Sequence, residues 1–340
     1  MNILFLIGNG FDINVGLNTR FKDALKSYLN EENKDLRIQK FKNDIRGNFE
    51  NWSDFEKQLG IYTENYSSTT IDDYCFCIKD FKESLIRHLK KEEDRVDFNA
   101  QKGKIVKVFN KSIFNFYDGL TNNSKNILRG IITQSANNKN TLLHNFITFN
   151  YTSVLDKCLE IIKKEPLRPN IGTILHIHGT ISKNSIMGVD NHSQIGNKEL
   201  SNNNRINWTI VKPTSNKKLK NLNDREGVNL ISRSDIICLF GLSLGETDKT
   251  WWEIIGSWLK TGSNRQLVIF NVVNQWNEIH PDEEIENIDA IEEKFCFAAG
   301  FSEKERETMA DRIHIGFNTD MFKVTLPSPN VDSRNFAVVQ

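Results

Sequence analysis

The sequence lacks the long apolar run that a membrane-spanning helix needs. Its first apolar stretch, Ile3–Ile7, is short and is followed at once by Gly8 and Gly10. No cluster of basic residues precedes the stretch, and no small-residue cleavage site follows it. We therefore expect a buried strand at this position, rather than a signal peptide or a membrane anchor.

The sequence also lacks an excess of either charge, because 44 Lys and Arg residues balance 44 Asp and Glu residues. This balance gives no reason to expect nucleic acid or an anionic membrane as a partner. The five cysteines are scattered, and the one close pair, Cys75 and Cys77, has no second pair to complete a zinc site. Reduced cysteines in a cytoplasmic protein, without a bound metal, are the simplest interpretation.

Short apolar runs recur at the beginning and in the second half of the chain. Near-continuous apolar runs of this length are typical of strands in a sheet that is covered on both faces. The six predicted strands are Ile3–Ile7, Phe146–Phe149, Ile174–Ile177, Ile236–Phe240, Leu267–Phe270 and Ile313–Ile315.

Helical patterns separate most of these strands, at Ser153–Lys163, Lys249–Lys260 and Ile285–Ala299. Strand–helix–strand alternation with crossovers of this length favours a parallel arrangement. The fold class that we predict is α/β, with a doubly wound, mostly parallel, six-stranded Rossmann-like sheet. We treat residues 1–340 as a single domain.

The first two predicted strands are separated by far more chain than a crossover needs. Most of it carries apolar residues at helical spacings of three and four, so residues 19–140 are predicted to form a helical insert or cap. Asn-rich and Lys-rich stretches such as Thr121–Lys125 and Asn216–Asn223 are predicted to be exposed loops. The predicted helices of the insert are Thr19–Leu29, Ser53–Tyr66, Thr70–Lys91 and Gly103–Tyr117.

A glycine-rich turn, Gly8-Asn9-Gly10-Phe11-Asp12, directly follows the first strand. Such a turn lets the backbone approach a phosphate, and the helix start behind it offers N–H donors. The dinucleotide fingerprint of hydride-transfer enzymes requires a third glycine where this chain has Ile13, so that pattern fails. The alternative is a tight turn without a ligand.

Polar residues follow two further strands. Asn150 comes after Phe146–Phe149, at the sheet edge where ligands bind in open α/β folds. Its amide has the chemistry to hold a ribose hydroxyl or a water, although a lone Asn more often closes a turn. Thr152 or Ser153 is expected to cap the next helix.

His176 and His178 flank Ile177, and alternation along a strand predicts that both rings lie on one face. His178 is nearer the end of the strand, and the neighbouring Gly179 is expected to keep its ring accessible. Histidine moves protons near neutral pH, so His178 is the candidate base. His176 is expected to be structural, and a metal-binding pair is the less favoured alternative because no nearby carboxylate or cysteine completes it.

A second glycine turn, Gly241-Leu242-Ser243-Leu244-Gly245, follows the strand Ile236–Phe240. Gly241 and Ser243 are candidate nucleotide contacts, and Asp248 is either another contact or the N-cap of the next helix. Asn271 ends the following strand at the same predicted edge. The tryptophans Trp251, Trp252 and Trp258 have helical spacing and are expected to be core residues.

Four motifs occur together in a recognisable order: ILFLIGNGFDINVGLNTRF from Ile3, FNYT from Phe149, HIHGT from His176 and GLSLGETD from Gly241. In this order the sequence resembles the bacteriophage abortive infection AbiH family over nearly the whole chain. Over the sheet and its loops it is also distantly similar to SIR2-like domains.

The SIR2-like resemblance implies a role for each motif in binding NAD. Gly8, Gly10 and their neighbours Asn9 and Phe11 would hold the phosphates. Asn150 would lie near the nicotinamide ribose, and His178 would be the catalytic base. Gly241–Leu244 would contact the nucleotide, and Asn271 the adenosine ribose. Sirtuins that deacylate lysine carry a four-cysteine zinc module, which this chain lacks, so the resemblance implies NAD cleavage rather than deacylation.

The leading hypothesis is therefore an antiphage NAD glycohydrolase in which His178, Asn150 and Asp12 act on the substrate, with no cofactor beyond NAD itself. The alternatives are a nucleotide sensor without turnover and an RNA nuclease. Neutral net charge and the lack of a clustered acidic metal set argue against the nuclease. Because constant NAD depletion would kill the host, we expect autoinhibition, a homo-oligomeric switch or a phage-derived activator.

Overall fold

A six-stranded, fully parallel sheet forms the centre of the computed structural model, which describes residues 1–138, 141–273 and 281–327. The strand order is β3-β2-β1-β4-β5-β6, in which the chain moves outward from β1 in both directions. The predicted α/β fold class, with a doubly wound parallel sheet, is confirmed. All six predicted strands are present: β1 (Asn2–Ile7), β2 (Leu143–Thr148), β3 (Ile171–His176), β4 (Ile236–Phe240), β5 (Gln266–Asn271) and β6 (Ile313–Phe317).

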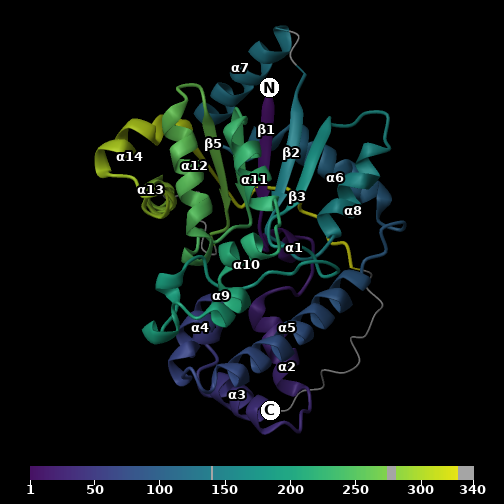
Figure 1. Cartoon of the computed structure of the whole chain (residues 1–340). Helices are drawn as coiled ribbons and strands as arrows, with labels where there is room; N and C mark the ends of the chain where they lie inside the picture. Colours follow the sequence, from purple (N-terminus) through teal and green to yellow (C-terminus); the bar gives the residue numbers. More distant parts are fainter. Residues whose placement is uncertain (139–140, 274–280, 328–340) are drawn as a thin grey trace.

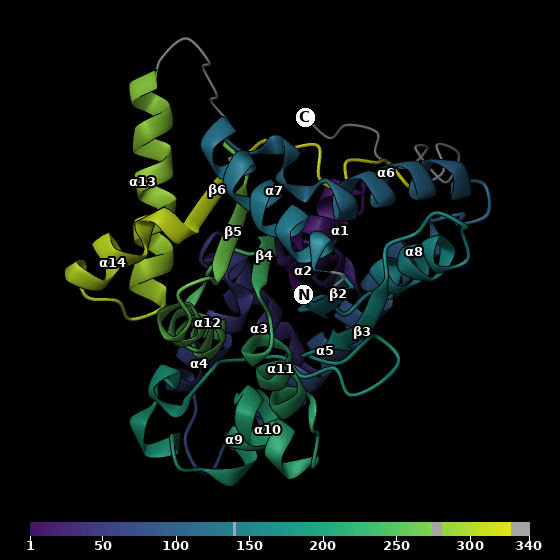
Figure 2. The same ribbon diagram turned by 90° about the horizontal axis from the view of Figure 1, so that it is seen from above.

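Both faces of the sheet are buried, as the continuous apolar runs predict. Alternate residues of β1 point to opposite sides: Phe5 belongs to one hydrophobic core, and Leu4 and Leu6 belong to the other. Figure 2 shows the sheet between two helical layers. One layer contains α6 (Lys102–Phe114), α7 (Asn122–Asn137) and α8 (Val154–Lys163), and the other contains α11 (Asn223–Ser232) and α12 (Lys249–Thr261).

The tryptophans of α12 are core residues, as predicted, since Trp251, Trp252 and Trp258 are at most 6% exposed. Beyond α12, α13 (Pro281–Ala298) and α14 (Glu303–Met309) extend this layer toward the edge strand β6. None of the helices in the described ranges combines the length and the apolarity that crossing a membrane requires.

The long segment between β1 and β2 is helical. Part of it forms a separate core, and part of it packs on the sheet. After the one-turn helix α1 (Gly10–Asn14), its first four helices form a separate hydrophobic core with α9 (Asn204–Ile210). This cap lies beyond the carboxyl ends of the strands (Figure 1). The segment then returns, so that α6 and α7 pack on the sheet. The cap helices are α2 (Phe21–Asn30), α3 (Leu36–Gly47), α4 (Phe55–Tyr62) and α5 (Ile71–Asp94).

Of two stretches that we predict to be exposed loops, one is helical, and the other is a loop only over residues 219–222. Thr121–Lys125 begins α7, where the Thr121 hydroxyl accepts a hydrogen bond from the Ser124 N–H and buried Leu128 anchors the helix to the core. Asn216–Asn223 starts inside α10 (Lys212–Lys218), and Asn216 is buried with its amide on Asp224. The predictions were wrong because tertiary contacts outweigh the weak helix propensity of asparagine.

The two glycine turns meet at the centre of the sheet, where the strand order reverses between β1 and β4. A Cβ atom on Gly10 would lie 2.4 Å from the Gly241 Cα, and one on Gly8 would lie 2.5 Å from the Gly241 carbonyl oxygen. Gly241 also has a φ of +69°, which favours glycine. These glycines are therefore required by the contact between the turns themselves.

We predict that Gly10→Ala lowers the free energy of unfolding by about 1–3 kcal/mol, since the added methyl group has no space beside Gly241. Gly47→Ala is the matched control, because no atom lies within 4 Å of the position that its added methyl group would take. Urea unfolding of both variants measures the difference. Equal stability of the two variants would contradict the close contact.

Candidate functional site

A cavity of about 740 Å³ lies where the carboxyl ends of the central strands face the cap. Pockets of 300–1,000 Å³ at such strand ends commonly hold nucleotide-sized ligands. Every candidate site residue except Phe11 lines this cavity. The lining candidates are Gly8, Asn9, Gly10, Asp12, Asn150, His178, Gly241, Ser243, Asp248 and Asn271.

Phe11 is the exception because its ring is fully buried in the core, between Phe109 and Phe322. Its N–H donates to the Gly8 carbonyl, so the backbone is also engaged. The prediction that Phe11 contacts the nucleotide is therefore wrong. Phe11 anchors the first turn to the core and offers no group to a ligand.

Most hydrogen-bond donors of the first turn are used within the protein itself. The N–H groups of Gly8 and Gly10 donate to the carbonyls of Phe240 and Gly241, each at 2.9 Å. The Asn9 amide exchanges hydrogen bonds with Thr19, at 3.0 and 2.6 Å. These groups fix the shape of the turn, so the N–H donors of Gly8 and Gly10 are not free for a phosphate.

Asp12 and Asn150 are buried next to each other on the cavity wall. Asp12 is 1% exposed and accepts a hydrogen bond from the Thr152 hydroxyl at 2.7 Å. Its other carboxylate oxygen has no hydrogen-bond partner in the described part of the chain, and neither polar atom of the Asn150 amide has one. Buried polar atoms without partners are rare, so this corner is suited to a polar ligand.

Burial raises the pKa of Asp12 to about 7, against the opposing effect of the hydrogen bond from the Thr152 hydroxyl. The carboxyl group therefore changes charge near neutral pH. Thr152 is committed to Asp12, and it does not cap α8 as we predict. The Ser153 side chain does not cap α8 either. The Ser153 N–H donates instead to Glu93 of α5, at 2.9 Å.

His176 and His178 point to opposite sides of the sheet, which contradicts the prediction of a shared face. β3 ends at His176, so strand alternation stops before His178. The His176 ring contacts the Asn150 carbonyl at 3.0 Å and Asp156 of α8 at 2.8 Å. Burial alone lowers the pKa of His176, but the hydrogen bond and charge of Asp156 outweigh it and raise the pKa. His176 thus supports the Asn150 backbone.

His178 turns toward the α12 side, where its Nε2 atom lies 3.0 Å from Asp248 Oδ1. The residue lines the cavity but is only 5% exposed, so its ring is less accessible than we predict. Gly179 has a φ of +76° and serves the backbone turn instead. The Nδ1 atom is buried and has no hydrogen-bond partner among the described residues.

Asp248 does not use its side chain as an N-cap, the alternative that we leave open from the sequence. Its carboxylate binds His178 and Lys212, with Lys212 Nζ at 2.7 Å from Oδ1. The Ser243 side chain is exposed at the second turn and has no hydrogen-bond partner in the described ranges. The Asn271 side-chain oxygen accepts the Val272 N–H at 2.8 Å.

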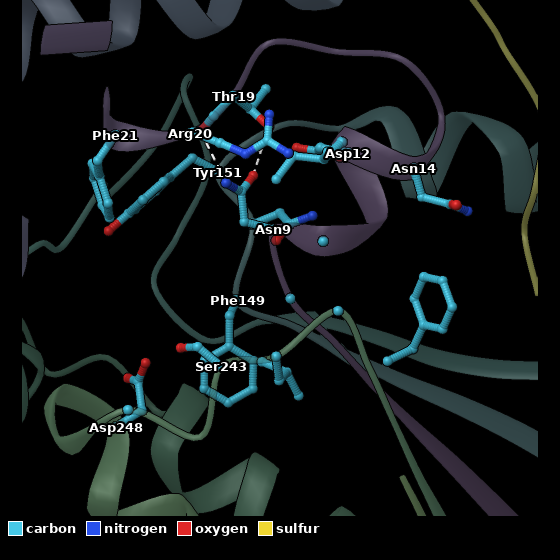
Figure 3. Close-up of a pocket in the computed structure, with 18 of the residues that line it drawn as sticks. Asn9, Asp12, Asn14, Thr19, Arg20, Phe21, Phe149, Tyr151, Ser243 and Asp248 are labelled. Atoms are coloured by element: carbon cyan, nitrogen blue, oxygen red, sulfur yellow. Dashed lines mark hydrogen bonds between the residues drawn. The ribbon is translucent and has the colours of Figure 1, made fainter. Parts of the chain in front are cut away.

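The cap contributes residues that sequence reasoning missed, and Arg20 is the foremost of them. Figure 3 shows Arg20 on the same side of the cavity as Asn9, Asp12 and Tyr151, with Ser243 and Asp248 on the other side. Arg20 forms no ion pair within the described ranges, so its guanidinium is free for an anion. An arginine in a loop has no sequence pattern that distinguishes it from a solvated one.

A family model for bacteriophage abortive infection AbiH proteins matches residues 4–270, which include both glycine turns, Asn150 and His178. The chain belongs to the AbiH family. Neither a curated protein nor a solved structure matches this AbiH protein significantly. Within residues 1–138, 141–273 and 281–327, no three acidic, histidine or cysteine side chains lie close enough together to hold a metal ion.

We predict that Asp12→Asn changes how stability depends on pH. The fold disfavours ionised Asp12, so the wild type loses stability between pH 4 and 7, where the unfolded chain releases the proton and the folded chain retains it. The variant cannot ionise there. Its free energy of unfolding should gain about 3 kcal/mol on the wild type across this range.

Urea unfolding at pH 4, 5.5 and 7 measures this difference, and Asp94→Asn, on the exposed surface of α5, controls for the loss of one carboxylate. A constant difference between wild type and Asp12→Asn at all three pH values would contradict the raised pKa.

Proposed function

We propose that this AbiH protein acts in abortive infection by hydrolysing NAD to nicotinamide and ADP-ribose. The observation that carries the proposal is the convergence of two glycine turns, the Asn150 amide and the His178 imidazole on one cavity. They come from segments far apart in the chain, and the cavity has the size expected for a dinucleotide.

The reaction breaks the bond between the ribose C1′ atom and the nicotinamide nitrogen. The electron pair of this bond goes to the nicotinamide ring, which leaves as a neutral molecule and needs no strong acid. Positive charge develops on the ribose, as in glycoside hydrolysis. Water then bonds to C1′ and releases a proton, which His178 accepts directly or through a ribose hydroxyl.

Asn150 and Asp12 are suited to the ribose end of the substrate. The Asn150 amide is 5% exposed and has a free donor and a free acceptor, which fit a ribose hydroxyl or the attacking water. Ionised Asp12 would stabilise the positive charge that develops at C1′. Because its pKa is about 7, this effect strengthens as the pH rises through neutrality.

The diphosphate would lie between the two glycine turns and Arg20. Gly8 and Gly10 keep the sheet edge flat, while Arg20 and the exposed Ser243 hydroxyl are free to bind anionic oxygens. Asn271 lies at the β5 end of the cavity, where it suits the adenosine ribose. In this arrangement the main phosphate contacts are side chains, rather than the N–H groups of Gly8 and Gly10.

Hydrolysis of the cytoplasmic NAD pool would stop phage replication together with host metabolism, which is the logic of abortive infection. Such an enzyme has to be inactive before infection. The cap supplies Arg20 and other residues of the cavity wall, so its position relative to the sheet offers a means of control. A phage-derived activator or self-association acting on the cap would provide the trigger.

We predict that purified protein releases nicotinamide from NAD, with or without phage lysate as activator, and that His178→Ala reduces the rate roughly 10²–10⁴-fold. His192→Ala is the matched control, because this exposed histidine does not line the cavity. Chromatography of the products measures the rate. Far-ultraviolet circular dichroism checks that the variants are folded.

Three results would contradict the proposal in different ways. Full activity of His178→Ala would remove His178 from the mechanism. Saturable NAD binding without release of nicotinamide under either condition would indicate a sensor. Release of labelled RNA fragments, abolished by EDTA, would indicate a nuclease.

A further inference from the structure

A chain of charged side chains runs from His178 to the cap, with Lys212 and Glu56 buried and Asp248 partly buried. Lys212 of α10 is at its centre, with Nζ 2.7 Å from Asp248 Oδ1 and 3.1 Å from Glu56 Oε2. Asp248 in turn contacts His178 Nε2 at 3.0 Å. Glu56 comes from α4 of the cap, where its other oxygen accepts the Gly188 N–H.

The ammonium group of Lys212 is deeply buried, because the side chain is only 5% exposed. Burial alone lowers the pKa of Lys212, but the charges of Asp248 and Glu56 outweigh it and raise the pKa above its usual value. Burial likewise raises the pKa of Asp248, but Lys212 and His178 together hold it well below its usual range. Asp248 is therefore an ionised acceptor.

This acceptor fixes the tautomer of neutral His178. A carboxylate can only accept a hydrogen bond, so the Nε2 atom facing Asp248 must carry the proton. The lone pair is then on Nδ1, the ring nitrogen that has no partner in the described part of the chain. A buried nitrogen without a partner, in a residue of the cavity wall, has the form of a base prepared for a ligand or a water.

We infer that Asp248 and Lys212 are positioning residues, which hold the His178 proton on Nε2 and leave Nδ1 as the base. The inference deepens the proposed function, since it rests on His178 serving as the base for NAD hydrolysis. Asp248 orients the ring directly, and Lys212 acts through Asp248. The same division of roles, in which a carboxylate selects the histidine tautomer, operates in serine proteases.

Other charged and titratable groups face the His178 ring and set its electrostatic surroundings. Asp190 and Asp224 lie with His178 and Asp248 around a second cavity of about 240 Å³. The Tyr151 ring lies 6.4 Å from the imidazole on the other side. Lys212 is the buried cation nearest to Asp248 in the described ranges. Its removal should therefore change the charge around Asp248 and His178 more than the loss of any other group.

The tautomer can be measured without any activity. Long-range proton–nitrogen NMR spectra of [¹⁵N]histidine-labelled protein at pH 8 distinguish a protonated Nε2 from a protonated Nδ1, and His178→Gln identifies the resonances by their loss. The wild type should show the proton on Nε2. In Asp248→Asn the new amide turns its oxygen to Lys212 and its NH₂ group to Nε2, so the proton should move to Nδ1.

Glu56→Gln is the matched control, because it removes the other partner of Lys212 while Asp248 stays in place. This variant should keep the wild-type tautomer. Wild-type protein with the proton on Nδ1, or an unchanged tautomer in Asp248→Asn, would overturn the inference.

The rate of nicotinamide release provides the second readout. Asp248→Asn should lose activity on the order of 10²-fold or more, since Nδ1 no longer offers a lone pair. Lys212→Met removes the cation that holds Asp248 in place, so its rate should also fall, and Lys212→Arg, which keeps a cation beside Asp248, should restore most of the rate. If Lys212→Met does not fold, the double variant Lys212→Met with Glu56→Gln is used in its place, because it removes one charge of each sign.

The two proposals fail in distinguishable ways. Wild-type protein with the expected tautomer but no nicotinamide release under any condition would leave the arrangement of Asp248 and His178 intact and refute NAD hydrolysis. Active wild-type protein together with full activity in Asp248→Asn would refute the positioning role of Asp248, and full activity in Lys212→Met would refute that of Lys212.

Discussion

The contact between the β1 and β4 turns is the constraint on which the rest of the structure depends. Gly8 and Gly10 leave no space for a side chain beside Gly241, so the two turns lie against each other where the sheet reverses direction. Their N–H groups are used to hold this contact. The glycines thus create a flat edge at the centre of the sheet, and the polar groups for a ligand come from elements around that edge.

These polar groups divide into two sets with different physical character. Asp12 and Asn150 have buried atoms without partners, a costly arrangement that a ligand would relieve. His178, Asp248, Lys212 and Glu56 form a connected chain, in which Lys212 pairs with both carboxylates and Asp248 also binds the neutral His178 ring. Removing one member of this chain would leave an uncompensated charge. Because that is costly, the intact chain has a rigid geometry. In the proposed enzyme, the first set meets the substrate and the second holds the base.

The sequence predicts the sheet well, because six apolar runs and the helical patterns between them allow few other folds. It also selects the cavity-lining residues, since polar residues after parallel strands gather at one edge. It fails where a role depends on contacts between distant segments. Lys212 and Glu56 are ordinary charged residues until α10 and α4 meet, and Arg20 depends on the cap. Asp248, Thr152 and the His176–His178 pair fit local rules that tertiary hydrogen bonds override.

A structure of the protein with carba-NAD, in which the ribose oxygen is replaced by a methylene group that prevents hydrolysis, tests the account most directly. The account predicts the dinucleotide in the 740 Å³ cavity, with its diphosphate between the two glycine turns and Arg20 and its nicotinamide ribose beside Asn150 and His178. A cavity that stays empty at saturating ligand, or a dinucleotide bound elsewhere, would contradict it.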